Sequence, residues 1–372
     1  MSVNSLPHSN QLPIFALAAS FDEVTNSYKF YWFLAILDHI KESQTRTIPV
    51  TTLLAHMVAR VWFPTNYFRL SFGKQDQLSN VATLLRESSG LPIDSSYSQV
   101  FDEALKHMQD KDDAGKSIYK IARFVPYRFL RPFFSGDLRG IKDTEINRRI
   151  SDLSQSTFDR SPCLYRFIEI ETKQAIEIHP EWFEYLKQHL TILRGFCLWK
   201  LIEYLQKHNP NVPNIPGKLF EPQERDMKRA REFWNIVFKK ETTLQCIYSG
   251  ETLDEKRYSL DHFIPWSFTA NDCIWNIIPT TKEVNSSKSD SIPKIDKYFD
   301  SFAKTQLDAV RIVSEKKPKL LEDHILLFKV DSASELQNMD LQDFSQHLRD
   351  TIIPQVQIAR NMGFLTDWEY RR

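Results

Sequence analysis

Apolar residues recur along most of the chain with helical spacing, so the sequence predicts a mainly α-helical protein. A first helix is expected to begin at Thr25 or Asn26. Between Phe30 and Leu37 it is apolar on nearly every face, which is typical of the buried central helix of a bundle. Further helices are predicted at 52–63, with Pro64 as the end, at 77–87 before Gly90, at 181–208, at 222–238 and beyond Pro293.

Four shorter stretches have the composition of strands. Residues 164–170 and 175–178 are rich in Ile and predict a small hairpin around Thr172 and Lys173. Residues 258–262 and 275–278 predict two more strands, which a loop separates and a threonine-capped helix follows. The expected fold is therefore mainly α with a small α+β module.

The clearest boundary in the chain is the stretch 209–217, which contains three prolines and one glycine. Residues 1–215 are expected to form a helical region, with the hairpin near 164–178, that recognises a substrate or a partner. Residues 218–296 are expected to form the compact α+β module, and residues 297–372 a helical C-terminal cover.

Composition narrows the functional classes. The chain has 48 basic and 48 acidic residues, which excludes a uniformly basic nucleic-acid coat but not a local charged site. None of its nine glycines forms a GxGxxG or GxxxxGK[ST] pattern, so no nucleotide cofactor is predicted. The longest strongly apolar stretch is too short to span a bilayer, and four cysteines without a CxxC pair predict a reduced, cytoplasmic protein.

The neutral total conceals two regions of opposite charge. Residues 116–149 hold nine basic and three acidic residues with aromatic residues between them, whereas residues 321–350 hold seven acidic and two basic residues. A basic strip with aromatic side chains is typical of a surface that follows a nucleic-acid backbone, so Arg123, Arg128 and Arg131 are candidate contacts. The alternative is an amphipathic segment whose aromatic side chains form core and whose arginines are merely solvated.

The candidate chemistry lies within residues 246–293. The first strand of the module ends in the adjacent residues Asp261 and His262, and Asn276 and Asn285 follow 14 and 23 positions after the histidine. A strand, a loop, a second strand and a helix would bring these four side chains close together. Hard oxygen ligands beside a histidine are what metal-assisted phosphodiester hydrolysis requires.

This stretch resembles the ββα-metal motif of the HNH nucleases, and in detail it is most similar to the HNH domain inside RNA-guided CRISPR nucleases. The resemblance rests on the opening Cys246-x-Tyr248-Ser249-Gly250, on the Asp-His pair followed by x-x-Pro, and on the spacing of the two asparagines. It covers about 50 of the 372 residues and implies nothing about the others.

The resemblance implies a role for each residue of the motif. His262 would be the general base that takes a proton from the attacking water, and Asn276 would orient the loop that bears it. Asp261 and Asn285 would hold one Mg²⁺ ion, for which Mn²⁺ is an expected substitute. Hydrolysis of DNA would leave 5′-phosphate and 3′-hydroxyl ends.

Two departures from related proteins narrow this expectation. Many HNH proteins fasten the motif with a zinc ion held by two CxxC pairs, but Ser249 stands three positions after Cys246 and no CxxC follows Asn285, so no structural zinc is expected. RNA-guided enzymes also need an RNase H-like domain and a guide-binding lobe, for which the sequence shows no signature. We therefore expect a stand-alone prokaryotic HNH nuclease that serves in anti-phage defence or restriction.

Three alternatives stay open at this point. Lys282 and Lys288 are candidate phosphate contacts, but a solvated helix face explains them equally well. The string Glu171-x-Lys173 resembles the acidic-x-Lys element of another restriction-enzyme fold, with Asp159 as the nearby candidate acid. The protein would alternatively be a nucleic-acid-binding or assembly subunit of a multi-protein defence complex, or a homo-oligomer, whose nuclease is active only with a partner.

Overall fold

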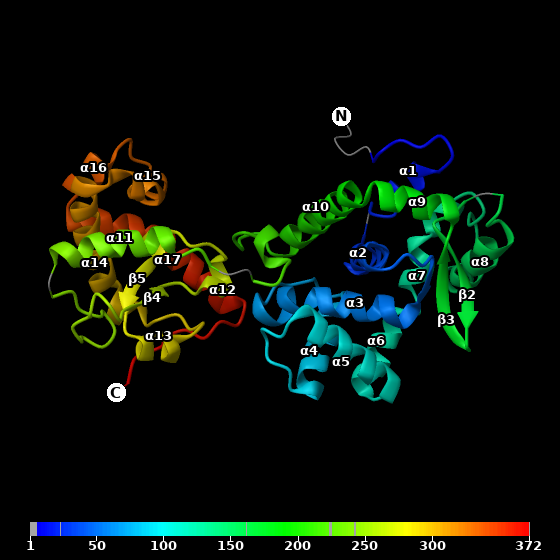
Figure 1. Cartoon of the computed structure of the whole chain (residues 1–372), viewed down its shortest axis with the longest axis horizontal. Helices are drawn as coiled ribbons and strands as arrows, with labels where there is room; N and C mark the ends of the chain where they lie inside the picture. The colour runs from blue at the N-terminus through cyan, green and yellow to red at the C-terminus, as the bar shows by residue number, and fades with distance from the viewer. Residues whose placement is uncertain (1–5, 23, 161, 223–224, 242, 372) are drawn as a thin grey trace. The chain divides into compact units, whose positions relative to one another are not determined.

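The computed structural model describes residues 6–22, 24–160, 162–222, 225–241 and 243–371. The protein is mainly α-helical with two small β-sheets, which confirms the predicted fold class. It divides into two compact units, one formed by residues 1–210 and 218–221 and the other by residues 211–217 and 222–372. Figure 1 labels most of the helices and strands of each unit. None of the described helices is long and apolar enough to cross a membrane.

The first unit is built around α2 (Tyr28–Glu42), in agreement with the predicted central helix. Every residue from Phe30 to Leu37 is at most 2% exposed, because α2 packs against α3 (Val50–Trp62), α9 (Pro180–Gln188) and α10 (Leu190–His208). Further helices of this unit are α1 (Ile14–Ala19), α4 (Leu78–Ser89), α5 (Tyr97–Asp110), α6 (Asp113–Ile121), α7 (Val125–Phe129) and α8 (Asp143–Ser156).

Two predicted helix boundaries differ in the structure. Pro64 does not end the helical path, because α3 passes into a π-helical turn at Phe63–Tyr67, where Phe68 N donates to Phe63 O at 2.9 Å. A proline inside a helix cannot donate to the carbonyl four residues earlier and crowds the preceding turn, so the α-helical pattern is interrupted at Pro64 and the chain continues as the wider π turn. The single helix predicted at 181–208 is two helices, since His189 leaves helical geometry between α9 and α10.

The sheet of the first unit is antiparallel, with the strand order β1 (Thr47–Pro49), β3 (Lys173–Ile178) and β2 (Tyr165–Ile170). β2 and β3 form the predicted hairpin. Glu171 and Thr172 at its tip have positive φ angles of 47° and 68°, a conformation that matches the twist of two antiparallel strands. β1 was not predicted, because three residues are too few to show a periodic pattern.

The second unit joins the α+β module and the C-terminal helices around one hydrophobic core, which extends from Ala230 to Phe364. The helix predicted at 222–238 begins at Lys228, and residues 223–224 of that range lie outside the described residues. The module contains α11 (Lys228–Lys240), β4 (Ser259–His262), α12 (Trp266–Thr269), β5 (Ile277–Thr280) and α13 (Lys282–Lys288). The helices that follow are α14 (Ile295–Lys316), α15 (Glu322–Phe328), α16 (Ala333–Asn338) and α17 (Leu341–Asn361), and α14 packs against α11, α16 and α17.

The segment after α17 returns to the module. Ile292 N donates to Leu365 O at 2.8 Å, and Trp368 N donates to Ile292 O at 3.0 Å. The ring of Trp368 lies edge-on against the ring of Tyr248, with centroids 5.4 Å apart. The module and the segment after α17 therefore complete one core together.

Candidate active site at the end of strand β4

β4 and β5 pair antiparallel, and His262 stands opposite Ile277 where the hairpin opens into a loop. Asn276 closes this loop: its carbonyl accepts from Phe263 N at 2.8 Å, and its side chain accepts from Ile264 N at 2.8 Å and donates to Ile264 O at 2.9 Å. The Asn276 side chain is fully buried. It therefore fixes the chain that follows His262 and does not face solvent.

Asp261 precedes His262 on β4 and is only 3% exposed. Its Oδ2 accepts a hydrogen bond from Tyr248 OH at 2.8 Å, and its Oδ1 lies 3.1 Å from Lys288 Nζ. Burial, with the Asp261 carboxylate as the second cause, raises the pKa of Tyr248 well above its usual 10, so the hydroxyl keeps its proton and donates. Both carboxylate oxygens of Asp261 thus have a protein partner.

Lys288 lies in the interior of the module. Its side chain is fully buried, and Nζ also donates to His262 O at 2.7 Å. The prediction that Lys288 contacts a phosphate is therefore wrong for this structure, because its ammonium group binds β4 and is not accessible. Lys282, at the start of the same helix, is exposed as predicted for a surface residue.

Asn285 lies one turn before Lys288 on α13 and is half-buried. Thr281 caps this helix by accepting a hydrogen bond from Val284 N at 3.2 Å. Among the residues that the structure describes, the Asn285 side chain has no hydrogen-bond partner. Its amide oxygen is therefore available to a ligand, in contrast to the buried amide of Asn276.

A carboxylate oxygen and an amide oxygen form a donor set that fits a hard divalent cation such as Mg²⁺ or Mn²⁺. Within the described ranges, no three His, Cys, Asp or Glu side chains gather into a group that could hold a metal ion. Magnesium commonly keeps several waters and takes phosphate oxygens as further ligands, so two protein ligands suffice for it. Cys246 is buried, with Sγ 3.1 Å from Thr280 Oγ1.

His262 is 4% exposed, and its Nε2 lies 2.9 Å from Oδ1 of Asp272, a residue that the sequence analysis did not single out. Asp272 lies ten positions after His262, in the loop between α12 and β5. The only sequence signal was an acid within this loop, and loop residues follow no period that would show which way they face.

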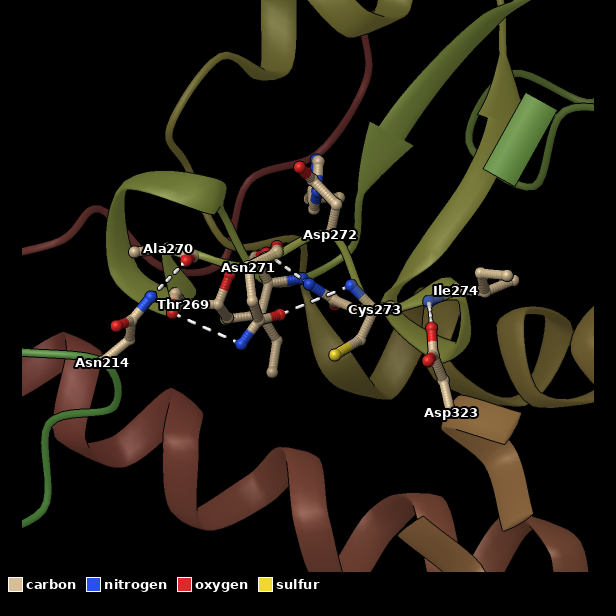
Figure 2. Close-up of polar contacts among 11 residues, drawn as sticks. Asn214, Thr269, Ala270, Asn271, Asp272, Cys273, Ile274 and Asp323 are labelled. Atoms are coloured by element: carbon tan, nitrogen blue, oxygen red, sulfur yellow. Dashed lines mark hydrogen bonds and ion pairs between the residues drawn. The ribbon is translucent and has the colours of Figure 1, made fainter. Parts of the chain in front are cut away.

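Contacts from two other parts of the unit hold this loop (Figure 2). Asn214, in the segment that connects to the first unit, donates from Nδ2 to Ala270 O at 2.6 Å. Asp323, on α15, accepts a hydrogen bond at Oδ2 from Ile274 N at 2.9 Å. The loop is therefore fixed on both sides of Asp272, two residues before it and two residues after it.

The arginines predicted to bind nucleic acid differ in their surroundings. Arg128 is bound within its own unit, since Nη1 lies 2.6 Å from Asp143 Oδ1 and Nε lies 2.8 Å from Asn147 Oδ1. Arg128 is therefore less available to a phosphate than an unpaired arginine, and its assignment as a nucleic-acid contact stays a prediction. Arg123 and Arg131 are exposed, and neither has an ion-pair partner among the described residues.

Arg123 lines a shallow hollow of about 580 Å³ on the surface of the first unit. Arg148 and Tyr119 are further exposed residues of its lining. Other aromatic residues of the basic strip lie inside the protein, where Phe129 is fully buried and Phe134 is 4% exposed. Some aromatic residues of the strip thus build core while others border an exposed basic surface, and nucleic-acid binding by this surface stays a prediction.

Glu171 and Lys173 lie exposed at the tip of the β2–β3 hairpin. Within the described part of the chain, no hydrogen bond or ion pair connects them with Asp159. The alternative nuclease element therefore gains no support from the structure.

A β-hairpin that ends in Asp-His and leads into a helix carrying asparagine defines a ββα module of the nuclease type. Residues 246–294 match the HNH endonuclease family, and the chain therefore contains an HNH-family domain. That family supports nuclease activity and nucleic-acid binding in general, and its members generally depend on a metal ion. Searches of the curated proteins and of the solved structures gave no significant match. The closer similarity to RNA-guided nucleases stays a prediction.

Proposed function

We propose that this protein is a DNA endonuclease that hydrolyses phosphodiester bonds with His262 as general base and one Mg²⁺ ion, or Mn²⁺ in its place. The observation that carries the proposal is the arrangement at the end of β4. Asp261 and His262 are consecutive residues there, and the Lys288 contacts tie α13 to the same strand. The side-chain amide of Asn285 on α13 has no hydrogen-bond partner among the described residues.

Each residue of the site has a task in this proposal. His262 takes a proton from the attacking water, and the scissile bond to the 3′ oxygen breaks to leave 5′-phosphate and 3′-hydroxyl ends. Asp261 and Asn285 would hold the cation, which when bound offsets negative charge on the phosphate and the departing oxygen. Tyr248 holds the Asp261 carboxylate in place, and Asn276 holds the loop after His262.

The first unit would supply DNA affinity. Arg123 and Arg131 are exposed and unpaired among the described residues, and Lys282 is exposed on α13. Such cations gain affinity by releasing counterions from the phosphate backbone. We place the activity in the cytoplasm of a prokaryote, in anti-phage defence or restriction, because an HNH domain is joined here to a separate helical unit.

The test is cleavage of plasmid DNA by the purified full chain with Mg²⁺ or Mn²⁺. His262→Ala should lower the rate about 100-fold to 10,000-fold, the range expected on loss of a general base. The control is His347→Ala, which removes an exposed histidine of the same unit. If wild type leaves plasmid, linear and single-stranded DNA intact with both metals, the proposal fails.

A second candidate function is a nuclease arm that cuts only when a partner or substrate rearranges its site. One observation favours it: both oxygens of Asp261 already bind protein donors, and one of these donors is the buried cation Lys288. Removal of that cation with Lys288→Met should tighten Mn²⁺ binding about tenfold in calorimetry, because a positive charge beside the ligand is lost. Unchanged or weaker Mn²⁺ binding by a folded Lys288→Met protein would contradict this resting-state hypothesis.

A further inference from the structure

We infer that Asp272 is a positioning residue for His262, which fixes the ring so that Nδ1 is the nitrogen that receives the proton from water. The inference rests on the proposed function for its catalytic meaning. The geometry itself concerns the resting protein and can be tested there without metal or DNA.

The contact with Asp272 determines which ring nitrogen of His262 carries the proton. The Nε2 atom of His262 lies 2.9 Å from Oδ1 of Asp272, and an ionised carboxylate can only accept a hydrogen bond. Nε2 therefore carries the hydrogen, and in the neutral imidazole Nδ1 holds the lone pair. A general base needs this lone pair at the nitrogen that faces its water.

The other ring nitrogen of His262, Nδ1, lies in different surroundings. No hydrogen bond to Nδ1 of His262 occurs among the described residues, and this atom is not one of their fully buried atoms without a partner. Nδ1 therefore keeps some accessible surface, although the residue as a whole is 4% exposed. Nε2 faces Asp272, and Nδ1 is the ring nitrogen without a partner among the described residues.

Several contacts hold the loop that carries Asp272. Ala270 has a left-handed φ of 50°, and Asn214 binds its carbonyl. Ile274 is held by Asp323, and Gln306 on α14 donates to Ile274 O at 3.3 Å and to Ile277 O at 2.8 Å. Figure 2 shows Asp272 between the Asn214 and Asp323 contacts. A loop held in this way keeps the carboxylate at one place, as preorganised catalysis requires.

Asp272 would affect the proposed reaction through the charge on His262. When water gives its proton to Nδ1, the ring becomes an imidazolium, and the water oxygen forms its bond to phosphorus as the bond to the 3′ oxygen breaks; the departing 3′ oxygen takes a proton from solvent water to become the 3′-hydroxyl. Asp272 keeps its charge and its hydrogen bond to Nε2, so it stabilises this cation throughout. Its contribution therefore appears in the rate of the chemical step and not in the affinity for DNA.

The first test is spectroscopic and uses the metal-free full chain in EDTA. Ring nitrogens of ¹⁵N-histidine-labelled protein report which nitrogen carries the proton at alkaline pH, and the signals missing from His262→Ala assign this histidine. Wild type should show the Nε2–H form, and Asp272→Ala should shift both ring signals toward an average of the two tautomers. The matched control is Asp331→Ala, which removes an exposed carboxylate of the same unit and should keep the wild-type signals. An Nδ1–H form in wild type, or unchanged signals in Asp272→Ala, would overturn the inference.

The second test is kinetic. Asp272→Ala should lower kcat about 10-fold to 100-fold, the usual effect of a partner that orients a functional histidine, while KM stays within about twofold. Asp272→Asn keeps the size of the side chain, so it replaces the alanine variant if that protein does not fold. A rise in KM with unchanged kcat, or an equal loss of kcat in Asp331→Ala, would contradict a positioning role of Asp272. If wild type does not cut DNA at all, the proposed function fails, and the ring signals alone decide on Asp272.

Discussion

Each unit of the protein contains a buried carboxylate beside cations, and the two clusters differ in what they leave unpaired. In the first unit, Asp38 on α2 binds the guanidinium of Arg60 on α3 through both oxygens, and Arg194 on α10 adds a contact of 2.8 Å. In the second unit, Asp261 binds Lys288 and Tyr248, while the side chains of His262 and Asn285 keep polar atoms that have no partner among the described residues.

The comparison shows that a buried charge alone does not mark an active site. The Asp38 cluster joins three helices, and its opposite charges satisfy one another, which is the pattern of a structural ion pair. The Asp261 cluster is equally buried, but it supports an available amide and a histidine nitrogen that keeps some accessible surface. Unsatisfied polar atoms next to a rigid buried charge therefore distinguish the candidate site.

The largest expected effect is a loss of stability when Asp38 is replaced, and it distinguishes the Asp38 cluster from the Asp261 cluster. Asp38→Asn leaves two guanidinium groups without their shared counter-charge, so the first unit should lose about 3–5 kcal/mol of unfolding free energy. Urea denaturation followed by circular dichroism measures the loss. The control is Asp22→Asn, which breaks an exposed pair with Lys200 and should cost at most about 1 kcal/mol. Cleavage by the folded Asp38→Asn protein should stay at the wild-type rate; a loss of activity in folded protein would break the distinction.

The next effect concerns Asn285. Asn285→Ala should lower the cleavage rate about 100-fold and raise the Mg²⁺ concentration needed for half-maximal rate, because one oxygen ligand is lost. DNA affinity in EDTA should not change, which fluorescence anisotropy measures directly. Ser286→Ala, at the next and exposed position of α13, is the control. Weaker DNA binding in EDTA would instead make Asn285 a DNA contact.

Acid should destabilise both units through one buried histidine each. Burial lowers the pKa of His56 in the first unit to about 4 and that of His324 in the second unit to about 3. The unfolded chain takes up these protons below its ordinary pKa of about 6.5, so stability is fully present above pH 6.5 and falls as the pH drops toward the folded values. At pH 5 each histidine should cost about 2 kcal/mol relative to pH 7.5.

Urea unfolding of the full chain at pH 7.5 and pH 5 measures this loss. His324→Gln should shrink the acid-induced loss in the second unit only, and His56→Gln that in the first unit only. An equal loss at pH 5 in wild type and in both variants would assign the acid sensitivity to other groups.

The smallest expected effect concerns the exposed basic surface of the first unit. Arg123→Ala combined with Arg148→Ala should weaken DNA binding about 3-fold to 10-fold and flatten its logarithmic salt dependence by about two. Arg128→Ala should change stability but not the salt slope, since Arg128 binds Asp143 inside its unit. Anisotropy titrations at several salt concentrations measure the slope. Equal slopes for the double variant and wild type would show that these arginines are solvated and do not contact DNA phosphates.

The sequence predicted those features of the fold that rest on long or well-bounded patterns. The apolar run at 30–37 showed a central helix, and the Ile-rich stretches showed the β2–β3 hairpin. The apolar pattern continues across His189, so the sequence did not show the break between the two helices. In the structure, Leu193 N still donates to His189 O across this break. The turn after α3 was missed because a proline inside a helical stretch indicates a helix end, although the chain here continues as a π turn with Pro64 as its second residue.

For the candidate site, the spacing of Asp261, His262, Asn276 and Asn285 identified the strands and the helix that carry them. Sequence alone could not show that Lys288 faces inward, since seven residues of helix give less than two full periods. Asp272 was missed for a different reason. Its contact with His262 depends on the path of a loop that is held by Asn214 and Asp323, which are distant in sequence.

The return of the segment after α17 to the module has a consequence for the order of synthesis. Tyr248, which holds Asp261, packs against Trp368, and Ile292 binds Leu365 and Trp368 through its backbone. A chain that grows on the ribosome from its N-terminus thus holds every candidate catalytic residue long before it can complete the core around them. The candidate site would mature only after residue 368 has emerged, and any cutting would be delayed until then.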